Sequence, residues 1–171
     1  MPDTPTPKPV RASRTVMSQL MMPHDANFAG VVHGGSLLSI MDKVAYACAS
    51  RHAGAYCVTA SVDEVHFRTP IAVGALVTFM ASVNYVGRTS MEIGIRVVAE
   101  EMPTGRTTHT NSSYFTMVAM GVGGKPSPVP PLVLETDDDR RRNEDARLRR
   151  QLRLDHRRAV EAKQKERGEI A

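Results

Sequence analysis

The chain has 171 residues, 42% of them hydrophobic, and a formal net charge of +4. This length suits one domain with a core and a tail, and no apolar run approaches the ~20 residues that span a bilayer. The proline-rich N-terminus lacks the apolar segment of a signal peptide. We therefore expect a globular, cytoplasmic protein that does not enter a membrane.

The charge pattern and the cysteines exclude further classes of function. Residues 1–136 carry 10 basic and 9 acidic side chains, and the remainder mixes 12 basic with 9 acidic ones and has no aromatic residue. We expect no nucleic-acid partner, because the tail lacks a stacking platform and the rest is nearly neutral. Cys48 and Cys57 are expected to be buried free thiols. No histidine–cysteine cluster has the spacing of metal ligands, so we expect no metal site.

The first third of the chain predicts one strand and one long helix. Residues 1–10 are expected to be disordered, residues 11–22 to form a strand, and a polar loop to follow as far as residue 34. From 35 to 51, apolar residues recur at the spacing of one helical face, at Leu37, Leu38, Met41, Val44, Ala45 and Cys48. This helix is apolar nearly all round, so we expect it to be buried.

The next segment predicts an antiparallel sheet. Residues 56–67, 75–86, 91–100 and 106–120 alternate between polar and apolar side chains and are separated by short turns, as in a meander. The fold class is therefore α+β, an antiparallel five-stranded sheet wrapped around one long central helix. Five strands cannot enclose the helix fully and leave open edges, which dimerisation would cover.

The chain ends in a helical tail beyond the main domain of residues 11–121. Residues 122–136 are rich in proline and predict an extended strap, and residues 137–171 predict a charged helix that begins with three aspartates. Because its apolar stripe is thin, we expect this tail to be solvated and the active site to work without it. A docking contact, or arginines near an anionic ligand, is the alternative.

The stretch from Asp25 to Asp42 has the pattern of a reactive site. A polar loop ends in Gly34 and Gly35, where the start of a helix offers free N–H groups to an oxyanion. The Asp42 carboxylate lies about two turns inside that helix, and burying an unpaired carboxylate costs several kcal/mol. An oxyanion on the N–H groups with a carboxylate nearby is an arrangement for acyl transfer.

With these residues in place, the sequence resembles the cytosolic long-chain acyl-CoA hydrolase group of the hotdog-fold acyl-CoA thioesterases. The resemblance covers roughly residues 14–142. The motifs that carry it are Asp25-Ala26-Asn27, Gly30, His33-Gly34-Gly35, Met41-Asp42-Lys43-Val44-Ala45, Ser50-Arg51-His52, Thr59-Ala60-Ser61-Val62-Asp63, Phe67, Ser90-Met91-Glu92-Ile93, Phe115-Thr116 and Pro128-Val129-Pro130-Pro131-Leu132-Val133 with Glu135.

The resemblance implies a hotdog fold and hydrolysis of fatty acyl-CoA to a free fatty acid and CoA. It implies no cofactor, since CoA is part of the substrate. It also implies a homodimer with one continuous sheet, and larger assemblies, often trimers of dimers. Relatives with two fused repeats take the loop asparagine and the helix aspartate of one site from different repeats. The implied site therefore joins Asn27 of one subunit to Asp42 of another.

Each candidate residue has a chemical role in thioester hydrolysis. Asp42 can activate water as a general base, the role we favour, or attack the thioester directly. Asn27 can hold the water or the carbonyl oxygen, and the Gly35 N–H is the expected oxyanion donor. His33 and Gly34 belong to the same loop, and His33 is expected to brace it. The CoA phosphates are expected at a basic strand turn, formed by Gly87, Arg88, Thr89 and Ser90, with Arg51 and Arg68 as weaker candidates.

Two alternatives stay within the same fold. A non-catalytic protein could bind acyl-CoA without cleaving it. A dehydratase acting on acyl thioesters would need His24 or His33 to pair with Asp42, and the His-Phe-Pro-Gly motif of hotdog dehydratases is absent.

Overall fold

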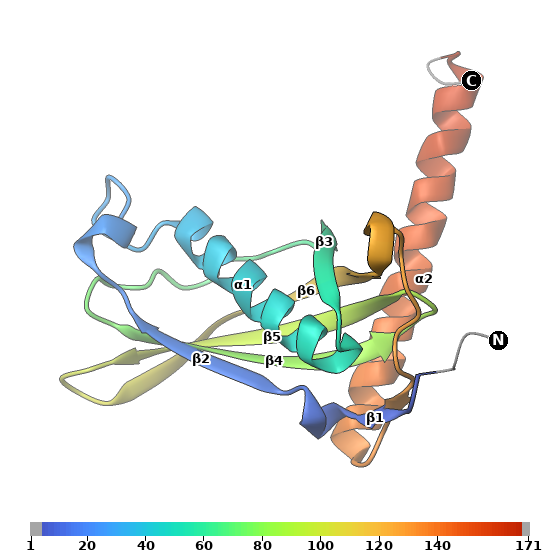
Figure 1. The fold of residues 1–171 in the computed structure, drawn as a ribbon. Coiled ribbons are helices and arrows are strands. Elements are labelled where there is room, and N and C mark those ends of the chain that lie inside the picture. The colour runs from blue at the N-terminus through green and yellow to red at the C-terminus, as the bar shows by residue number, and fades with distance from the viewer. Residues whose placement is uncertain (1–4, 169–171) are drawn as a thin grey trace.

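The computed structural model describes residues 5–168, which form a curved five-stranded sheet, a small two-stranded sheet and two long helices (Figure 1). Short 3₁₀ turns cover Val10–Ala12, Pro23–Asp25 and Val122–Gly124. The strands and helices, in chain order, are β1 (Lys8–Pro9), β2 (Thr15–Leu20), α1 (Gly34–Ala53), β3 (Tyr56–Val62), β4 (Leu76–Val86), β5 (Ser90–Glu101), β6 (Arg106–Met120), β7 (Leu132–Val133) and α2 (Asp137–Glu166).

The main sheet has five antiparallel strands in the order β2-β4-β5-β6-β3. Only β4, β5 and β6 form a meander. The expectation that β3 belongs to it was wrong, because β3 pairs with β6 and a segment of residues 63–75 returns the chain to β4. A connection of that length spans the sheet, whereas a hairpin turn would have placed β3 beside β4.

The helix α1 crosses the concave face of the sheet and supplies much of the core (Figure 1). Its buried residues are Leu37, Ile40, Met41, Val44, Ala45, Cys48, Ala49 and His52. The expectation that α1 is buried nearly all round was wrong for the single chain. Leu38, Asp42 and Tyr46 are exposed, because five strands of one chain cover only one side of the helix.

The N-terminal segment and the proline-rich strap close the C-terminal end of α1. Strand β1 pairs in parallel with β7 of the strap, and the Lys8 ammonium donates to the carbonyl of His52 at 2.8 Å. The His52 ring, which is fully buried, contacts the Pro130 carbonyl through Nε2 at 2.9 Å. The expectation of disorder was therefore wrong for Lys8 and Pro9, and residues 1–4 of that segment lie outside the described residues.

The first half of α2 packs on the sheet face opposite α1. Asp139, Asn143 and Ala146 are buried, and the Asn143 side chain donates to the backbone carbonyl of Asn84 in β4 at 2.7 Å. A fully solvated helix was thus the wrong prediction, since only the end of α2 extends away from the body (Figure 1). Neither α2 nor any other helix within residues 5–168 is long and apolar enough to span a membrane.

Both cysteines are buried free thiols, as expected. Burial raises the pKa of the Cys48 thiol to about 12 and also raises the pKa of Cys57. Neither thiol therefore forms a reactive thiolate near neutral pH.

Candidate active site

The Asp42 carboxylate lies in an open cleft between α1 and β3. Its Oδ1 accepts a hydrogen bond of 2.5 Å from the hydroxyl of Thr59. The cleft has a volume of about 320 Å³ and is lined by Asp42, Lys43, Tyr46, Tyr56, Cys57, Val58, Thr59 and Met117. Lys43 forms no ion pair with Asp42 in the described part of the chain. Thr59 is therefore the intramolecular partner that orients this carboxylate.

The position of Thr59 depends on an irregularity in β3. The pairing of β3 with β6 shifts register between Thr59 and Ser61, which marks a β-bulge. Bulges re-aim side chains and are common beside active sites. The sequence motif contained Thr59, but its role was missed because a threonine in a strand is usually only a strand former.

Asn27 is held in a tight loop by its own side chain. Its Oδ1 accepts hydrogen bonds from the backbone N–H of Ala29 at 2.9 Å and of Val31 at 3.4 Å, an Asx-type turn. Gly30 has a φ of 77°, which the loop requires and which glycine adopts without strain. With Oδ1 so engaged, the Nδ2 group has no partner among the described residues and can donate to a ligand.

The start of α1 differs from the expectation. The Nδ1 of His33 accepts a hydrogen bond of 2.8 Å from the Gly35 N–H, so this histidine caps the helix. The Gly35 N–H, expected as the oxyanion donor, is engaged by this ring in the present conformation, and its catalytic role stays a prediction. The Gly34 N–H has no partner within residues 5–168. A Cβ at Gly34 would lie 3.1 Å from the exposed Phe67 ring, so a larger residue there would require the ring to move by a few tenths of an ångström.

The turn from Gly87 to Ser90 lies at the same end of the sheet as Thr59. Thr59 pairs with Met117, and Met117 pairs with Met91 at the start of β5. The Arg88 and Thr89 carbonyls accept hydrogen bonds from Val129 and Ala119, so the turn is anchored while the Arg88 side chain is exposed. Two strand spacings, about 10 Å, separate this turn from the Thr59 strand.

Of the other candidate residues, Arg51 and His24 have partners within the chain, whereas Arg68 is exposed. The Arg51 guanidinium donates to the Arg14 carbonyl and to the Thr15 hydroxyl, both at 3.1 Å, so it holds β2 against α1. Arg68 is exposed in the segment that follows β3. His24 lies 3.7 Å from the Asp25 carboxylate. A dehydratase would require His24 or His33 to pair with Asp42. Among the described residues of one chain, neither histidine contacts Asp42.

The outer face of the sheet carries a second polar cluster, which joins α2 to the strands. Glu92 is only 2% exposed, and Arg149 binds it at 2.7 Å. Arg153 binds Asp63 at 2.5 Å and reaches Glu92 at 3.5 Å. The Arg149 guanidinium also lies 3.5 Å from the centre of the Tyr114 ring. Burial raises the pKa of the Asp63 carboxyl, and the Arg153 charge opposes that shift.

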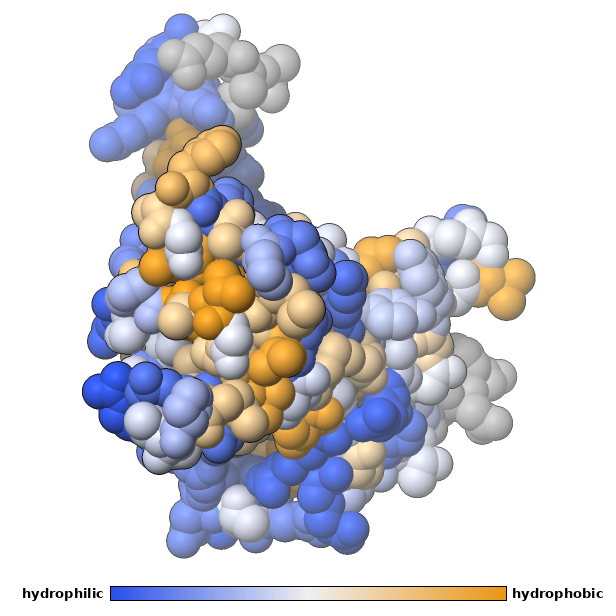
Figure 2. All heavy atoms as spheres, turned by 90° about the vertical axis from the view of Figure 1, so that its left-hand side faces the viewer, coloured by the Kyte–Doolittle hydropathy of each residue, from blue (hydrophilic) through white to orange (hydrophobic). Residues whose placement is uncertain are grey.

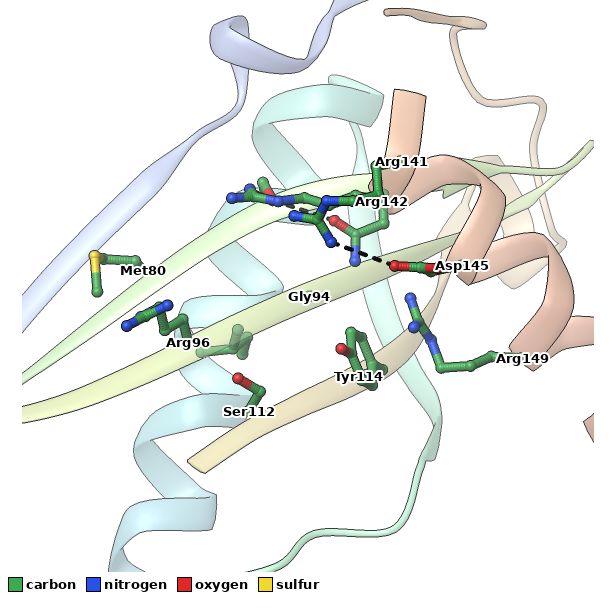
Figure 3. A pocket seen from close by; sticks show the side chains of 12 residues that line it. Met80, Gly94, Arg96, Ser112, Tyr114, Arg141, Arg142, Asp145 and Arg149 are labelled. Atoms are coloured by element: carbon green, nitrogen blue, oxygen red, sulfur yellow. Dashed lines mark hydrogen bonds and ion pairs between the residues drawn. The ribbon is translucent and has the colours of Figure 1, made fainter. Parts of the chain in front are cut away.

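A pocket of about 270 Å³ opens between this cluster and strands β4, β5 and β6. Figure 3 shows Arg141, Arg142 and Arg149 extending from α2 over the strands that carry Arg96 and Tyr114. The three α2 arginines bind carboxylates of this chain, at Asp138, Asp145 and Glu92. Of these pairs, only Arg149–Glu92 joins α2 to the sheet, because Asp138 and Asp145 belong to α2 itself.

Known proteins match most of this chain. Residues 29–106 match the family model of the thioesterase superfamily. VdlD of Helicobacter pylori is 50% identical over 141 residues, 82% of this chain and 80% of that protein. YkhA of Bacillus subtilis, described as an uncharacterised acyl-CoA thioester hydrolase, is 36% identical over 137 residues, 80% of each. The chain belongs to the thioesterase superfamily. The cytosolic acyl coenzyme A thioester hydrolase of mouse is 36% identical over 85% of this thioesterase chain, which spans 39% of the mouse protein.

Solved thioesterase structures have the same fold. A hexameric acyl-CoA thioesterase superposes with a TM-score of 0.85 at 38% identity, covering 88% of this chain and 97% of that one. An acyl-CoA hydrolase of Bacillus cereus superposes with a TM-score of 0.86 at 34% sequence identity, covering 97% of this chain and 99% of that one. The Staphylococcus aureus acyl-CoA hydrolase, in complex with butyryl-CoA and CoA, superposes with a TM-score of 0.84 at 32% sequence identity. The match covers 92% of this chain and 95% of that one. The hotdog fold expected from the sequence is confirmed.

Proposed function

We propose that this protein hydrolyses fatty acyl-CoA to a free fatty acid and CoA, with Asp42 as the general base. The observation that carries the proposal is the Asp42 carboxylate, oriented by the Thr59 hydroxyl in a cleft open to a ligand. The relatives named acyl-CoA thioester hydrolases support the choice of substrate class. A relative bound to butyryl-CoA supports it as well.

Asn27 is proposed to reach this cleft from a partner subunit. In the single chain, α1 leaves Asp42 and Tyr46 exposed, and β3 has an unpaired edge with Tyr56 and Val62 exposed. Pairing of two β3 edges would cover this apolar surface and satisfy the backbone groups of both edges. We further propose that such dimers assemble as a trimer of dimers, in keeping with the hexameric relative.

Structures of altered relatives support the same three residues. Variants of the Staphylococcus aureus hydrolase replace one asparagine, one aspartate or one threonine with alanine. The three positions have the same spacing along the chain as Asn27, Asp42 and Thr59 have here. This agreement favours a functional unit made of the loop amide, the helix carboxylate and the strand hydroxyl.

The proposed reaction follows from the donors and acceptors left free. Asp42 takes a proton from a water molecule, whose oxygen attacks the thioester carbonyl carbon. The Asn27 Nδ2 group and the Gly34 N–H donate to the carbonyl oxygen as negative charge develops on it. The carbon–sulfur bond then breaks, and Asp42 returns its proton to the CoA thiolate. Direct attack by Asp42, which would form a mixed anhydride, remains the alternative pathway.

The CoA group is proposed to lie along the turn from Gly87 to Ser90. Arg88 supplies an exposed cation, and Thr89 and Ser90 supply hydroxyl groups, near the end of the sheet that holds Thr59. We also propose a cytoplasmic location for the protein. The two free thiols and the mouse relative, which is named cytosolic, support this location.

Release of free thiol from acyl-CoA tests the proposed function. We expect turnover in the wild type and a loss of about 100-fold or more in Asp42→Asn, since positioned acid–base groups contribute 10²–10⁴-fold. Ser39→Ala, on the same exposed face of α1, is the matched control and should keep its activity. Light scattering should show the same assembly in all three proteins. Unchanged turnover in Asp42→Asn would overturn the assignment, and binding of acyl-CoA without thiol release in the wild type would indicate a non-catalytic binding protein.

A further inference from the structure

Phe28 is an aromatic residue that its own chain leaves completely exposed. It lies in the loop that projects beyond the start of α1 (Figure 1). The loop is braced on both sides of Phe28, because Asn27 accepts backbone hydrogen bonds from Ala29 and Val31. Figure 2, which views the molecule from this end, shows apolar surface gathered among polar side chains. Met22, Phe67 and Val73 are also exposed, and their segments contact the same loop or the start of α1.

The chain connection to Asn27 limits where the backbone of Phe28 can lie in the proposed dimer. Consecutive Cα atoms are about 3.8 Å apart. If Asn27 of one subunit reaches the thioester above the partner's Asp42, Phe28 must therefore lie beside the same cleft. This step depends on the proposed function, and in particular on the site being shared between two subunits.

The cleft around Asp42 offers a surface of matching chemistry. The Tyr46 and Tyr56 rings lie 5.8 Å apart at an angle of 60°, both are exposed, and both line the cleft together with Met117. Aromatic rings at such separations attract one another through their edges and faces. A further aromatic ring, or an acyl chain held against it, would be shielded from water here.

We propose that Phe28 of one subunit closes the partner's cleft and forms a wall of the passage that holds the acyl chain. It is a specificity-determining residue, because its contact area adds to the binding of long chains and adds nothing to that of acetyl-CoA. The ligand it selects is a long acyl group. Asn27 and Phe28 would thus act together, one on the carbonyl oxygen and the other on methylene groups farther along the acyl chain.

Fluorescence tests the placement, because the chain contains no tryptophan. Phe28→Trp creates a single reporter, and Val122→Trp is the matched control, since Val122 is also fully exposed in the single chain. We expect the emission of Phe28→Trp to lie at shorter wavelength than that of the control. In an Asp42→Asn background, where bound substrate persists, palmitoyl-CoA should shift it further than acetyl-CoA. Emission equal to that of the control, with and without palmitoyl-CoA, would overturn the proposal.

Kinetics test the specificity. Phe28→Ala should lower kcat/KM for palmitoyl-CoA about tenfold through lost apolar contact and change that for acetyl-CoA by less than about twofold. Val122→Ala should change neither. Equal losses at every chain length would contradict a role in specificity. The two proposals can fail independently. Turnover that persists in Asp42→Asn would refute the proposed function. The emission of Phe28→Trp reports on the contact of residue 28 with the partner subunit, whether or not the protein is active.

Discussion

The acidic residues on the two faces of the sheet differ in burial and in how many partners they have within the chain. On the outer face, Glu92 is buried and bound by Arg149 and Arg153, so its charge is satisfied within the chain. On the α1 side, Asp42 is exposed and has one intramolecular partner, Thr59. A charged group whose hydrogen bonds and ion pairs are all made within its own chain stabilises the fold. A charged group that keeps unused hydrogen-bonding capacity is available to substrate. The loss of activity expected in Asp42→Asn, without a loss of stability, is the largest effect that this comparison predicts.

The next largest effect is expected from the buried acid of the outer face. Glu92→Ala should lower the free energy of unfolding by about 3–5 kcal/mol, because it leaves the partly buried Arg149 without its carboxylate partner. Glu161→Ala, on the exposed end of α2, should have almost no effect. Urea denaturation measures both. A small change in Glu92→Ala would mean that the cluster is less important to the fold than its burial indicates.

Two truncations sharpen the contrast between the halves of α2. Ending the chain at Thr136 removes Arg149 and Arg153 and exposes Glu92, so we expect a destabilisation of several kcal/mol. Ending it at Leu154 retains those contacts and should change stability by less than about 0.5 kcal/mol. Thermal unfolding distinguishes them. Equal melting temperatures for the two would restore the sequence-based expectation that the whole tail is dispensable.

A smaller effect is expected at the start of α1. His33→Ala removes the helix cap on the Gly35 N–H and should cost about 1 kcal/mol. His33→Asn keeps a capping side chain and should recover most of that loss. Calorimetry of the two variants measures the difference. If both variants matched the wild type, the hydrogen bond from Gly35 would contribute nothing to stability.

The smallest effect concerns pH. Burial lowers the pKa of His52 below its ordinary value of 6.5, so below that pH the unfolded chain binds more protons at this residue than the folded one. Its contribution to stability is therefore fully present above pH 6.5 and is lost as the pH falls towards the lower, folded-state pKa. His52→Gln should show a flatter decline of melting temperature between neutral and mildly acidic pH. Parallel declines in the two proteins would contradict this account.

Local patterns in the sequence determined most of the secondary structure. The helix predicted at 35–51 is α1, at Gly34–Ala53, and the strand predicted at 106–120 is β6 within the same limits. The motif around Asn27 and Asp42 identified the family, since its residues lie close together in the chain. Periodicity, turns and short motifs act over a few residues, which is why they could be interpreted without the fold.

Only the tertiary structure decided what depends on distant residues. It placed β3 beyond β6, set the Thr59 hydroxyl on Asp42, and fastened α2 through Arg149 and Arg153. Helix α2 docks on the sheet through ion pairs with residues far away in the chain. An apolar stripe, the usual sequence signal for docking, is therefore not needed and is only thin in this helix. The Gly35 N–H likewise looked free until the His33 ring was seen to cap it. Pairing between distant polar groups leaves no periodic trace, because each partner alone resembles a solvated side chain.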